Sequence, residues 1–161
     1  MGRIYSVTYN GTITNAGGNT DLLSITPADD KPVKLRGFTL GQISEVGDVA
    51  EEGLRVTVKR LPATFTVGSG GSAVTPSPMD SADVAAGCTT RCKDTTVATT
   101  SSTAVVLDEI GWNIRNTPLP IWYPDDRFCP KVKGGEGLAV VLETTPADDF
   151  TGCFTFWLEE E

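Results

Sequence analysis

Two stretches of the chain alternate apolar and polar residues with a period of two, a pattern typical of β-strands that bury one face. They cover residues 33–40 and 54–59, and the acid-rich segment between them reads as a loop. We therefore predict two antiparallel strands of one sheet, paired across this loop. A slip of one residue would bury cationic side chains, so this pair should fix the register of the sheet. In the second strand the expected buried face is made by Leu54, Val56 and Val58.

Further strand signals occur on both sides of this pair. Residues 4–14 form one of them, with a hairpin signal at Asn10–Gly11. Ala104–Leu107 reads as a buried strand, and residues 137–143 are expected to form a hairpin with residues 150–159. In that last strand two faces are predicted: Phe154, Phe156 and Leu158 on one, and Cys153, Thr155 and Trp157 on the other.

Residues 62–102 have a different character, with many glycine, serine and proline residues. Pro76 and Pro78 exclude a regular helix or a central strand at that point. Met79–Gly87 has room for one helical turn at most. We expect this segment to be a long irregular excursion from the sheets.

These patterns add up to eight to ten short strands, turn signals at regular intervals and almost no helical periodicity. Such a pattern predicts an all-β sandwich or barrel. Residues 1–161 are expected to form one β-sandwich domain, because 161 residues suffice for one core of ordinary size. A jelly-roll-like sandwich of antiparallel strands, with the 62–102 excursion in the middle, is the preferred member of that class.

Charge narrows the range of partners. The formal net charge is −8, which opposes non-specific binding to nucleic acid and to anionic membranes, so neither is expected as a partner. No run approaches the roughly 18 apolar residues that a membrane-spanning helix needs. The first residues lack the apolar core of a secretion signal.

Several residues invite a chemical interpretation, but none forms a catalytic motif. The chain has no histidine, which removes the usual triads and the usual general base. Gly68–Ala73 fits a dinucleotide fingerprint, but two prolines follow where a helix should start. Pairs of neighbouring aspartates read better as turn caps than as metal ligands. We therefore expect no enzyme activity, no metal and no cofactor.

The four cysteines leave two interpretations open. Cys88 and Cys92 are close in sequence, whereas Cys129 and Cys153 stand apart, which matches an all-thiolate zinc site poorly. Cys153 falls within a strand and reads as a small buried apolar residue. Because no secretion signal is present, free thiols are favoured slightly over disulfides.

Four segments of the chain are distinctive enough to be compared with known protein families. They are PADDKPVKLRGFTLGQISEVGDVAEEGLRVTVKR, GSGGSAVTPSPMDSADVAAG, DTTVA and TPADDFTGCFTFWLEEE. Together they cover close to half of the chain, and they resemble a family of small proteins of tailed bacteriophages, the head decoration (cement) proteins. Residues 112–133 depart from the family in their aromatic residues and cysteines.

The resemblance implies a structural virion protein on the capsid surface, made in the bacterial cytoplasm. It would bind the outside of the major capsid protein lattice, stabilise the head, and associate with itself as a homotrimer. Within this sequence, aromatic residues and arginine are the types enriched at interface cores. The candidate interface residues are Ile4, Tyr5, Tyr9, Trp122, Tyr123, Arg127 and Phe128. An alternative is that the aromatic group near Trp122 only covers one open end of the sandwich.

Other functional classes stay open at this point. A carbohydrate-binding sandwich would use Trp112, Trp122 or Tyr123 as stacking platforms. A tail or connector subunit would form rings instead of trimers. An enzyme on a β-sandwich would need a pair of facing carboxylates.

Overall fold

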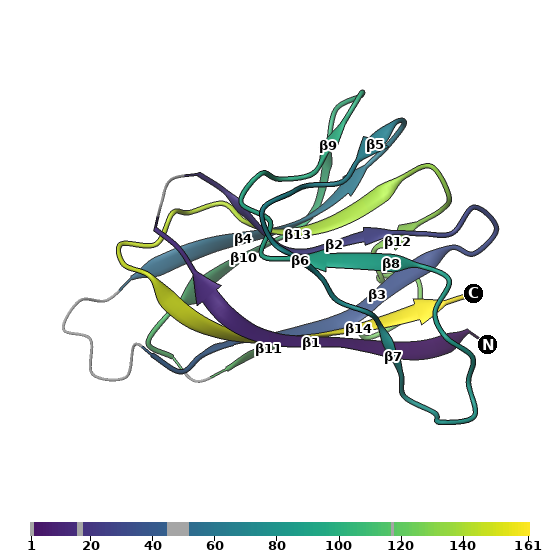
Figure 1. The fold of residues 1–161 in the computed structure, drawn as a ribbon, viewed down its shortest axis with the longest axis horizontal. Coiled ribbons are helices and arrows are strands. Elements are labelled where there is room, and N and C mark those ends of the chain that lie inside the picture. Colours follow the sequence, from purple (N-terminus) through teal and green to yellow (C-terminus); the bar gives the residue numbers. More distant parts are fainter. Residues whose placement is uncertain (1, 16–17, 45–51, 117) are drawn as a thin grey trace.

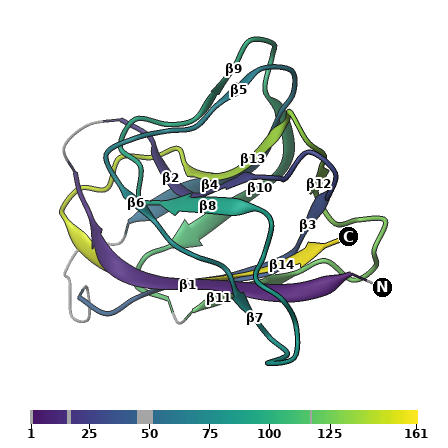
Figure 2. The ribbon, with the colours of Figure 1, turned by 45° about the vertical axis from the view of Figure 1, so that its right-hand side comes forward.

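A computed structural model describes residues 2–15, 18–44, 52–116 and 118–161. These residues form fourteen strands and no helix, so the predicted all-β class is confirmed. Two sheets pack face to face as a sandwich (Figures 1 and 2). In the described residues no helix is long and apolar enough to cross a membrane.

Eight strands make up the body of the sandwich. The first sheet contains β1 (Arg3–Ile13), β3 (Val33–Gln42), β11 (Leu119–Trp122) and β14 (Phe150–Glu160). The second contains β2 (Thr20–Thr26), β4 (Gly53–Leu61), β10 (Val105–Asn113) and β13 (Gly137–Leu142). The shorter strands are β5 (Phe65–Thr66), β6 (Ser72–Ala73), β7 (Ser77–Pro78), β8 (Thr89–Cys92), β9 (Thr99–Thr100) and β12 (Lys131–Val132).

The pairing of the eight main strands is nested. β1 pairs with β14, β2 with β13, β3 with β11 and β4 with β10, each pair antiparallel. The two sheets have the orders β11–β3–β14–β1 and β10–β4–β13–β2. This is one long hairpin rolled into two sheets, which is a jelly roll. The excursion at residues 62–102 forms the tip of that hairpin, between β4 and β10.

Two expected strand pairs are wrong. β3 and β4 lie in opposite sheets, and so do β13 and β14. In this jelly roll the chain changes sheet after every main strand except β4. The acid-rich segment between β3 and β4 therefore connects the two sheets; its residues 45–51 lie outside the described part. Asn10–Gly11 is not a turn either, because β1 runs through it opposite Gly152 and Cys153.

The simple alternation expected for residues 33–40 fails at a β-bulge. Gly37 lies opposite Trp157 and Leu35 opposite Leu158, so Arg36 has no partner in β14. An extra residue in one strand shifts its alternation by one position. As a result Leu35 and Phe38 both point into the core although three positions separate them. The apolar faces predicted for β4 and β14 are confirmed, because Val56, Val58, Phe154 and Phe156 all belong to the core between the sheets.

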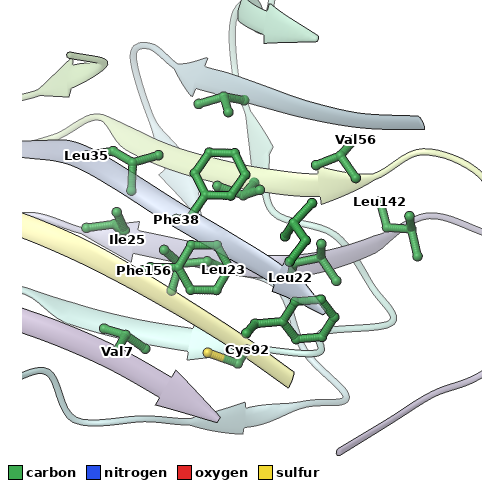
Figure 3. Packing of buried hydrophobic residues seen from close by; sticks show 14 of the residues in the cluster. Val7, Leu22, Leu23, Ile25, Leu35, Phe38, Val56, Cys92, Leu142 and Phe156 are labelled. Atoms are coloured by element: carbon green, nitrogen blue, oxygen red, sulfur yellow. The ribbon is translucent and has the colours of Figure 1, made fainter. Parts of the chain in front are cut away.

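The core lies between the two sheets. Figure 3 shows side chains of both sheets meeting there, among them Phe38 and Phe156 from one sheet and Leu23 and Val56 from the other. The rings of Phe38 and Phe156 stack with their centroids 5.8 Å apart. Trp112, considered above as a sugar platform, belongs to this core with its ring edge against Phe150. Burial of this many large apolar side chains is the main term that stabilises the fold.

The excursion is irregular, as expected, but it is attached to both sheets. β8 and β6 extend the second sheet beyond β2, and β7 pairs with β1 in the first sheet. β5 and β9 form a narrow arm that projects at the top of Figure 1. The described residues 79–87 contain no helical turn.

One buried carboxyl group fastens the excursion to the second sheet. The backbones of Asp21 and Asp94 exchange two hydrogen bonds, and Oδ2 of Asp21 accepts the N–H of Ala98 at 2.7 Å. Oδ1 of Asp21 has no hydrogen-bond partner in the described residues. Burial, together with the nearby Asp94 carboxylate, raises the pKa of Asp21 to about 7.

The last three residues form a clamp. Glu159 accepts a hydrogen bond from the backbone N–H of Gly2, which holds the N-terminus. Glu160 accepts the backbone N–H groups of Gly87 and Cys88 and so holds the excursion. Glu161 pairs with Lys34 and Lys131. These three glutamates therefore connect Gly2, just before β1, with the excursion and the β3–β12 pair, instead of only facing solvent.

The strand expected to be buried at Ala104–Leu107 is exposed. Val105, Val106 and Leu107 begin β10, and each is more than a third exposed. In the described part of the chain β10 has a neighbour, β4, on one side only. Leu107 also lies at a bulge without a partner in β4. The apolar run belongs to a sheet edge and not to the core.

Candidate functional site

The outer face of the first sheet and the loop beside it carry four of the seven candidate interface residues. Alternate residues of each strand point away from the core, and the pairing places them in rows across the sheet. One row runs from Trp122 over Gly37 to Trp157 and then to Ser6. The next row has Pro120, Thr39, Thr155 and Thr8 in the same strand order. This face is therefore part aromatic and part hydroxyl-bearing.

Two tryptophans form the most distinctive feature of this face. The rings of Trp122 and Trp157 stack with centroids 4.5 Å apart, and Trp122 is 58% exposed. Gly37 lies beneath them: a Cβ there would be 2.7 Å from the Cε3 atom of Trp122. The glycine thus gives the Trp122 ring room to lie against the sheet. An exposed indole held flat in this way loses little side-chain freedom when it binds a partner.

A network of charges lies beside the tryptophans. The ammonium group of Lys34, which is almost fully buried, binds both carboxylate oxygens of Asp126, at 2.8 and 2.9 Å, and also pairs with Glu161. Arg36, on the same outer face of β3 as Lys34, pairs with Asp126 at 2.7 Å and with Glu159 at 3.3 Å. Hydrogen bonds from Lys131 and Lys34 lower the pKa of Glu161 to about 2, and a hydrogen bond from Lys34 lowers the pKa of Asp126.

This network holds the loop of residues 123–130 in place. Asp125 accepts the backbone N–H of Arg127 at 2.9 Å through its side chain and that of Phe128 at 3.0 Å through its carbonyl. Asp126 anchors the same loop to β3 through Lys34 and Arg36. Phe128 is left 65% exposed, and Arg127 also extends into solvent. The loop therefore presents an aromatic ring and a guanidinium from a fixed backbone.

Two hollows occur on the same face. One, of about 790 Å³, is lined by Ile4, Gly2 and the charged network. The other, of about 400 Å³, is lined mainly by uncharged residues, including Thr8, Asn10, Thr39 and Thr155. Trp157 lies opposite Ser6, between Ile4 of the first hollow and Thr8 of the second. The tryptophan pair thus stands between a charged depression and a neutral one.

The predicted interface residues fall into two groups. Ile4, Trp122, Arg127 and Phe128 belong to this face or to the loop beside it. Tyr5 is fully buried, and its hydroxyl donates to the carbonyl of Val84, so it cannot contact a partner without rearrangement. Alternation explains this difference, because neighbouring residues of β1 point to opposite sides of the sheet.

Tyr9 and Tyr123 are also turned inward. The hydroxyl of Tyr9 donates to the carbonyl of Leu22 at 2.6 Å, and its ring packs on the core. The hydroxyl of Tyr123 donates to Asp108 of β10 at 3.1 Å. Tyr123 therefore ties the edges of the two sheets together, which matches the alternative of an aromatic cover over one open side. Burial raises the pKa of both phenols.

Trp157 was missed as a candidate from the sequence. Its outward direction was predicted, but its stacking on Trp122 depends on the pairing of β14 and β11 with β3. No local signal reports that pairing. Arg36 was missed for a related reason, because its contact with Asp126 depends on how the loop of residues 123–130 packs against β3.

The cysteines are free thiols in the structure. Cys153 was expected to be buried, but it is only half-buried and lines the neutral hollow, because it falls on the outward face of β14. Burial raises the pKa of Cys88 to about 11 and that of Cys92 to about 12, which keeps both protonated at neutral pH. In the described residues no group of three cysteine, aspartate or glutamate side chains is arranged to hold a metal ion.

Comparison with known proteins adds little to this geometry. No protein-family model matches the chain, and no curated protein matches it. Among solved structures, one match is the structure of infectious bursal disease virus Gx strain, with 15% sequence identity and a TM-score of 0.20. It covers 99% of this chain and 42% of the viral chain. A TM-score this low supports no conclusion about fold or function.

Proposed function

We propose that this chain is a structural protein of a bacteriophage head, a decoration protein that binds the outside of the major capsid protein lattice and stabilises it. The observation that carries the proposal is the exposed Trp122, held flat by Trp157 and Gly37 beside the loop that presents Arg127 and Phe128. Aromatic residues and arginine dominate the energetics of protein interfaces. We refer to this surface, Trp122, Trp157, Arg127 and Phe128, as the docking face.

Three further features support the proposal. The chain resembles decoration proteins over close to half of its length, and jelly rolls are a common fold in viral capsids, although a fold alone does not give a function. The body of the sandwich packs one continuous core between two sheets, which suits a protein that reinforces a shell. The net charge of −8 keeps many copies soluble before they assemble.

The proposal is tested by co-sedimentation with heads. Heads of the phage that encodes the chain are assembled without it, mixed with purified protein and pelleted. Wild type should saturate at a fixed number of copies per head and raise the temperature at which heads break. Trp122→Ala and Phe128→Ala should each weaken binding at least tenfold while the chain stays folded. Val67→Ala is the matched control, because Val67 is also exposed but lies next to the β5–β9 arm.

The same face favours one second candidate, a carbohydrate-binding module. Trp122 remains as a stacking platform, whereas Trp112 is in the core and Tyr123 is turned toward Asp108. The neutral hollow next to it offers hydroxyl and amide groups from Thr8, Thr39 and Asn10. Binding of the isolated protein to glycans, lost in Trp122→Ala, together with no binding to heads, would favour this function.

The number of copies in solution separates decoration from a tail or connector role. A homotrimer has a mass of three times 17.1 kDa and would fit a three-fold position on the lattice. A ring of six or more copies would instead favour the tail or the connector. Weak contacts from each copy of a trimer can add up to firm attachment, because the second and third contacts form within one complex.

A further inference from the structure

Two exposed apolar patches lie at opposite edges of the sandwich. The first, the β10 patch, consists of Val105, Val106 and Leu107, with Val106 48% exposed. The second, the β7-loop patch, consists of Met79 and Val84 in the loop after β7, at 59% and 55% exposed. This loop projects at the lower right of Figure 1. Exposed clusters of large apolar residues mark interaction sites more often than chance.

The strand order places the patches on different sides. β10 ends the second sheet, on the side where β11 ends the first, and Tyr123 joins these two edges through Asp108. β7 lies at the other end of the first sheet, with β3, β14 and β1 between it and β11. One copy therefore cannot cover one of its patches with the other.

Each patch has a charged residue beside it that makes no ion pair in the described residues, and the two residues are opposite in sign. Arg60 lies opposite Val105 in the pairing of β10 with β4, and among the described residues it makes no ion pair. Asp80 follows Met79 directly, and in the described residues its carboxylate accepts only the backbone N–H of Ala82. A cation beside one apolar patch and an anion beside the other would be paired if the patches met.

We propose that copies of this chain associate head to tail, with the β10 patch of one copy on the β7-loop patch of the next. The partner is a second copy because the chain itself carries both halves of the contact, apolar and charged. A contact between two different surfaces generates a closed ring or an open filament, and it does not generate a two-fold dimer. β10 is also a sheet edge, where uncovered backbone groups make association with another chain favourable.

The head-to-tail contact describes how the homotrimer of the proposed function would form. Only the expected number of copies, three, rests on that proposed function. Assembly is measured on purified protein, whereas docking is measured on heads. A monomer that still binds heads would overturn head-to-tail assembly alone. An assembled chain that fails to bind heads would overturn the docking alone.

The test uses two variants that each spoil one patch, Val106→Glu and Val84→Glu, with mass measured by light scattering. Wild type should be larger than a dimer, and each variant should have the monomer mass of 17.1 kDa. An equimolar mixture of the two should form a one-to-one dimer, since the Val84→Glu copy keeps its β10 patch and the Val106→Glu copy keeps its β7-loop patch. Val67→Glu, an exposed change outside both patches, should leave the wild-type mass.

Three outcomes would overturn the proposal. They are a monomeric wild type at the highest concentration reached, a mixture that stays monomeric, or a Val84→Glu variant that still assembles, which would indicate contact between two β10 edges. Near-ultraviolet circular dichroism shows whether each variant is folded. As a second approach, Arg60→Asp and Asp80→Arg should each weaken assembly at least tenfold, and the double variant should restore most of it. If the double variant assembled even more weakly than either single variant, with the two losses adding up, the proposed pairing of Arg60 with Asp80 would be contradicted.

Discussion

Trp122 stacks on Trp157 above the backbone of Gly37, with the two ring centroids 4.5 Å apart. The two tryptophans are 35 positions apart in the sequence, and three strands have to pair in register before they meet. The docking face is therefore a product of the whole first sheet and not of one local motif.

Gly37→Ala should displace the Trp122 ring. The new Cβ would lie 2.5 Å from the carbonyl oxygen of Ile121 and 2.7 Å from the indole, so one of them has to move. Overpacking of this kind lowers the free energy of unfolding by about 1–3 kcal/mol. The variant should lose the near-ultraviolet signal of the stacked indoles and bind heads weakly. Gly53→Ala is the control, because nothing lies within 4 Å of a Cβ there. An unchanged tryptophan signal in Gly37→Ala would contradict the stacking.

Glu160→Ala should loosen the excursion. Glu160 is buried and accepts the N–H groups of Gly87 and Cys88, which would be left without partners. Unsatisfied buried donors of this kind reduce the free energy of unfolding by about 1–3 kcal/mol each. Hydrogen exchange should speed up in residues 79–88 before it does in the core. Glu109→Ala, which removes an exposed ion pair with Arg55, should change stability by less than about 1 kcal/mol. Equal effects of the two substitutions would show that the clamp has no special role.

Asp21 should make the chain less stable as the pH rises from about 4 to above 7. Its folded pKa of about 7 lies above the ordinary value of 3.8, so the folded state holds its proton more tightly than the unfolded state. The stabilisation is complete at low pH and is lost as the pH passes through 7. Each unit of pKa difference corresponds to about 1.4 kcal/mol, so the total is a few kcal/mol.

Asp21→Asn isolates this contribution from the other carboxyl groups. The amide resembles the protonated acid, so urea unfolding of the variant should lack this part of the pH dependence. It should be more stable than wild type at pH 8 and similar to it at pH 4. A wild type and a variant with parallel pH profiles would refute a buried Asp21 carboxyl group with a raised pKa.

Thiol labelling should distinguish Cys153 from the buried cysteines. Cys153 faces outward in the neutral hollow, whereas Cys88 and Cys92 are buried with raised pKa values. At pH 8 a thiol reagent should modify Cys153 rapidly in the native protein and the other three only on unfolding. Cys153→Ser should abolish the fast phase. A fast phase that survives in this variant would place a reactive thiol elsewhere.

The sequence predicted the class of fold because alternation reports which face of a strand is buried. It did not predict the pairing, since residues 33–40 and 54–59 show the same pattern whether they share a sheet or face each other across the core. The bulge at Arg36 shifted the outward residues of β3 by one position, and no residue in the local sequence predicts a bulge there. The apolar run at Val105–Leu107 looked like a core strand because a short run of apolar residues has the same composition in the core and at a sheet edge. Trp122 could be nominated from residue type alone, but its partner Trp157 could not.

The most direct test of the account is a reconstruction by electron cryomicroscopy of heads that have been saturated with purified wild-type protein. If the docking face binds the capsid, added density should lie on the outside of the lattice, with Trp122, Arg127 and Phe128 turned toward the major capsid protein. Heads treated with Trp122→Ala should lack this density at the same concentration. No added density with wild type, or density in which the docking face points into solvent, would contradict the account.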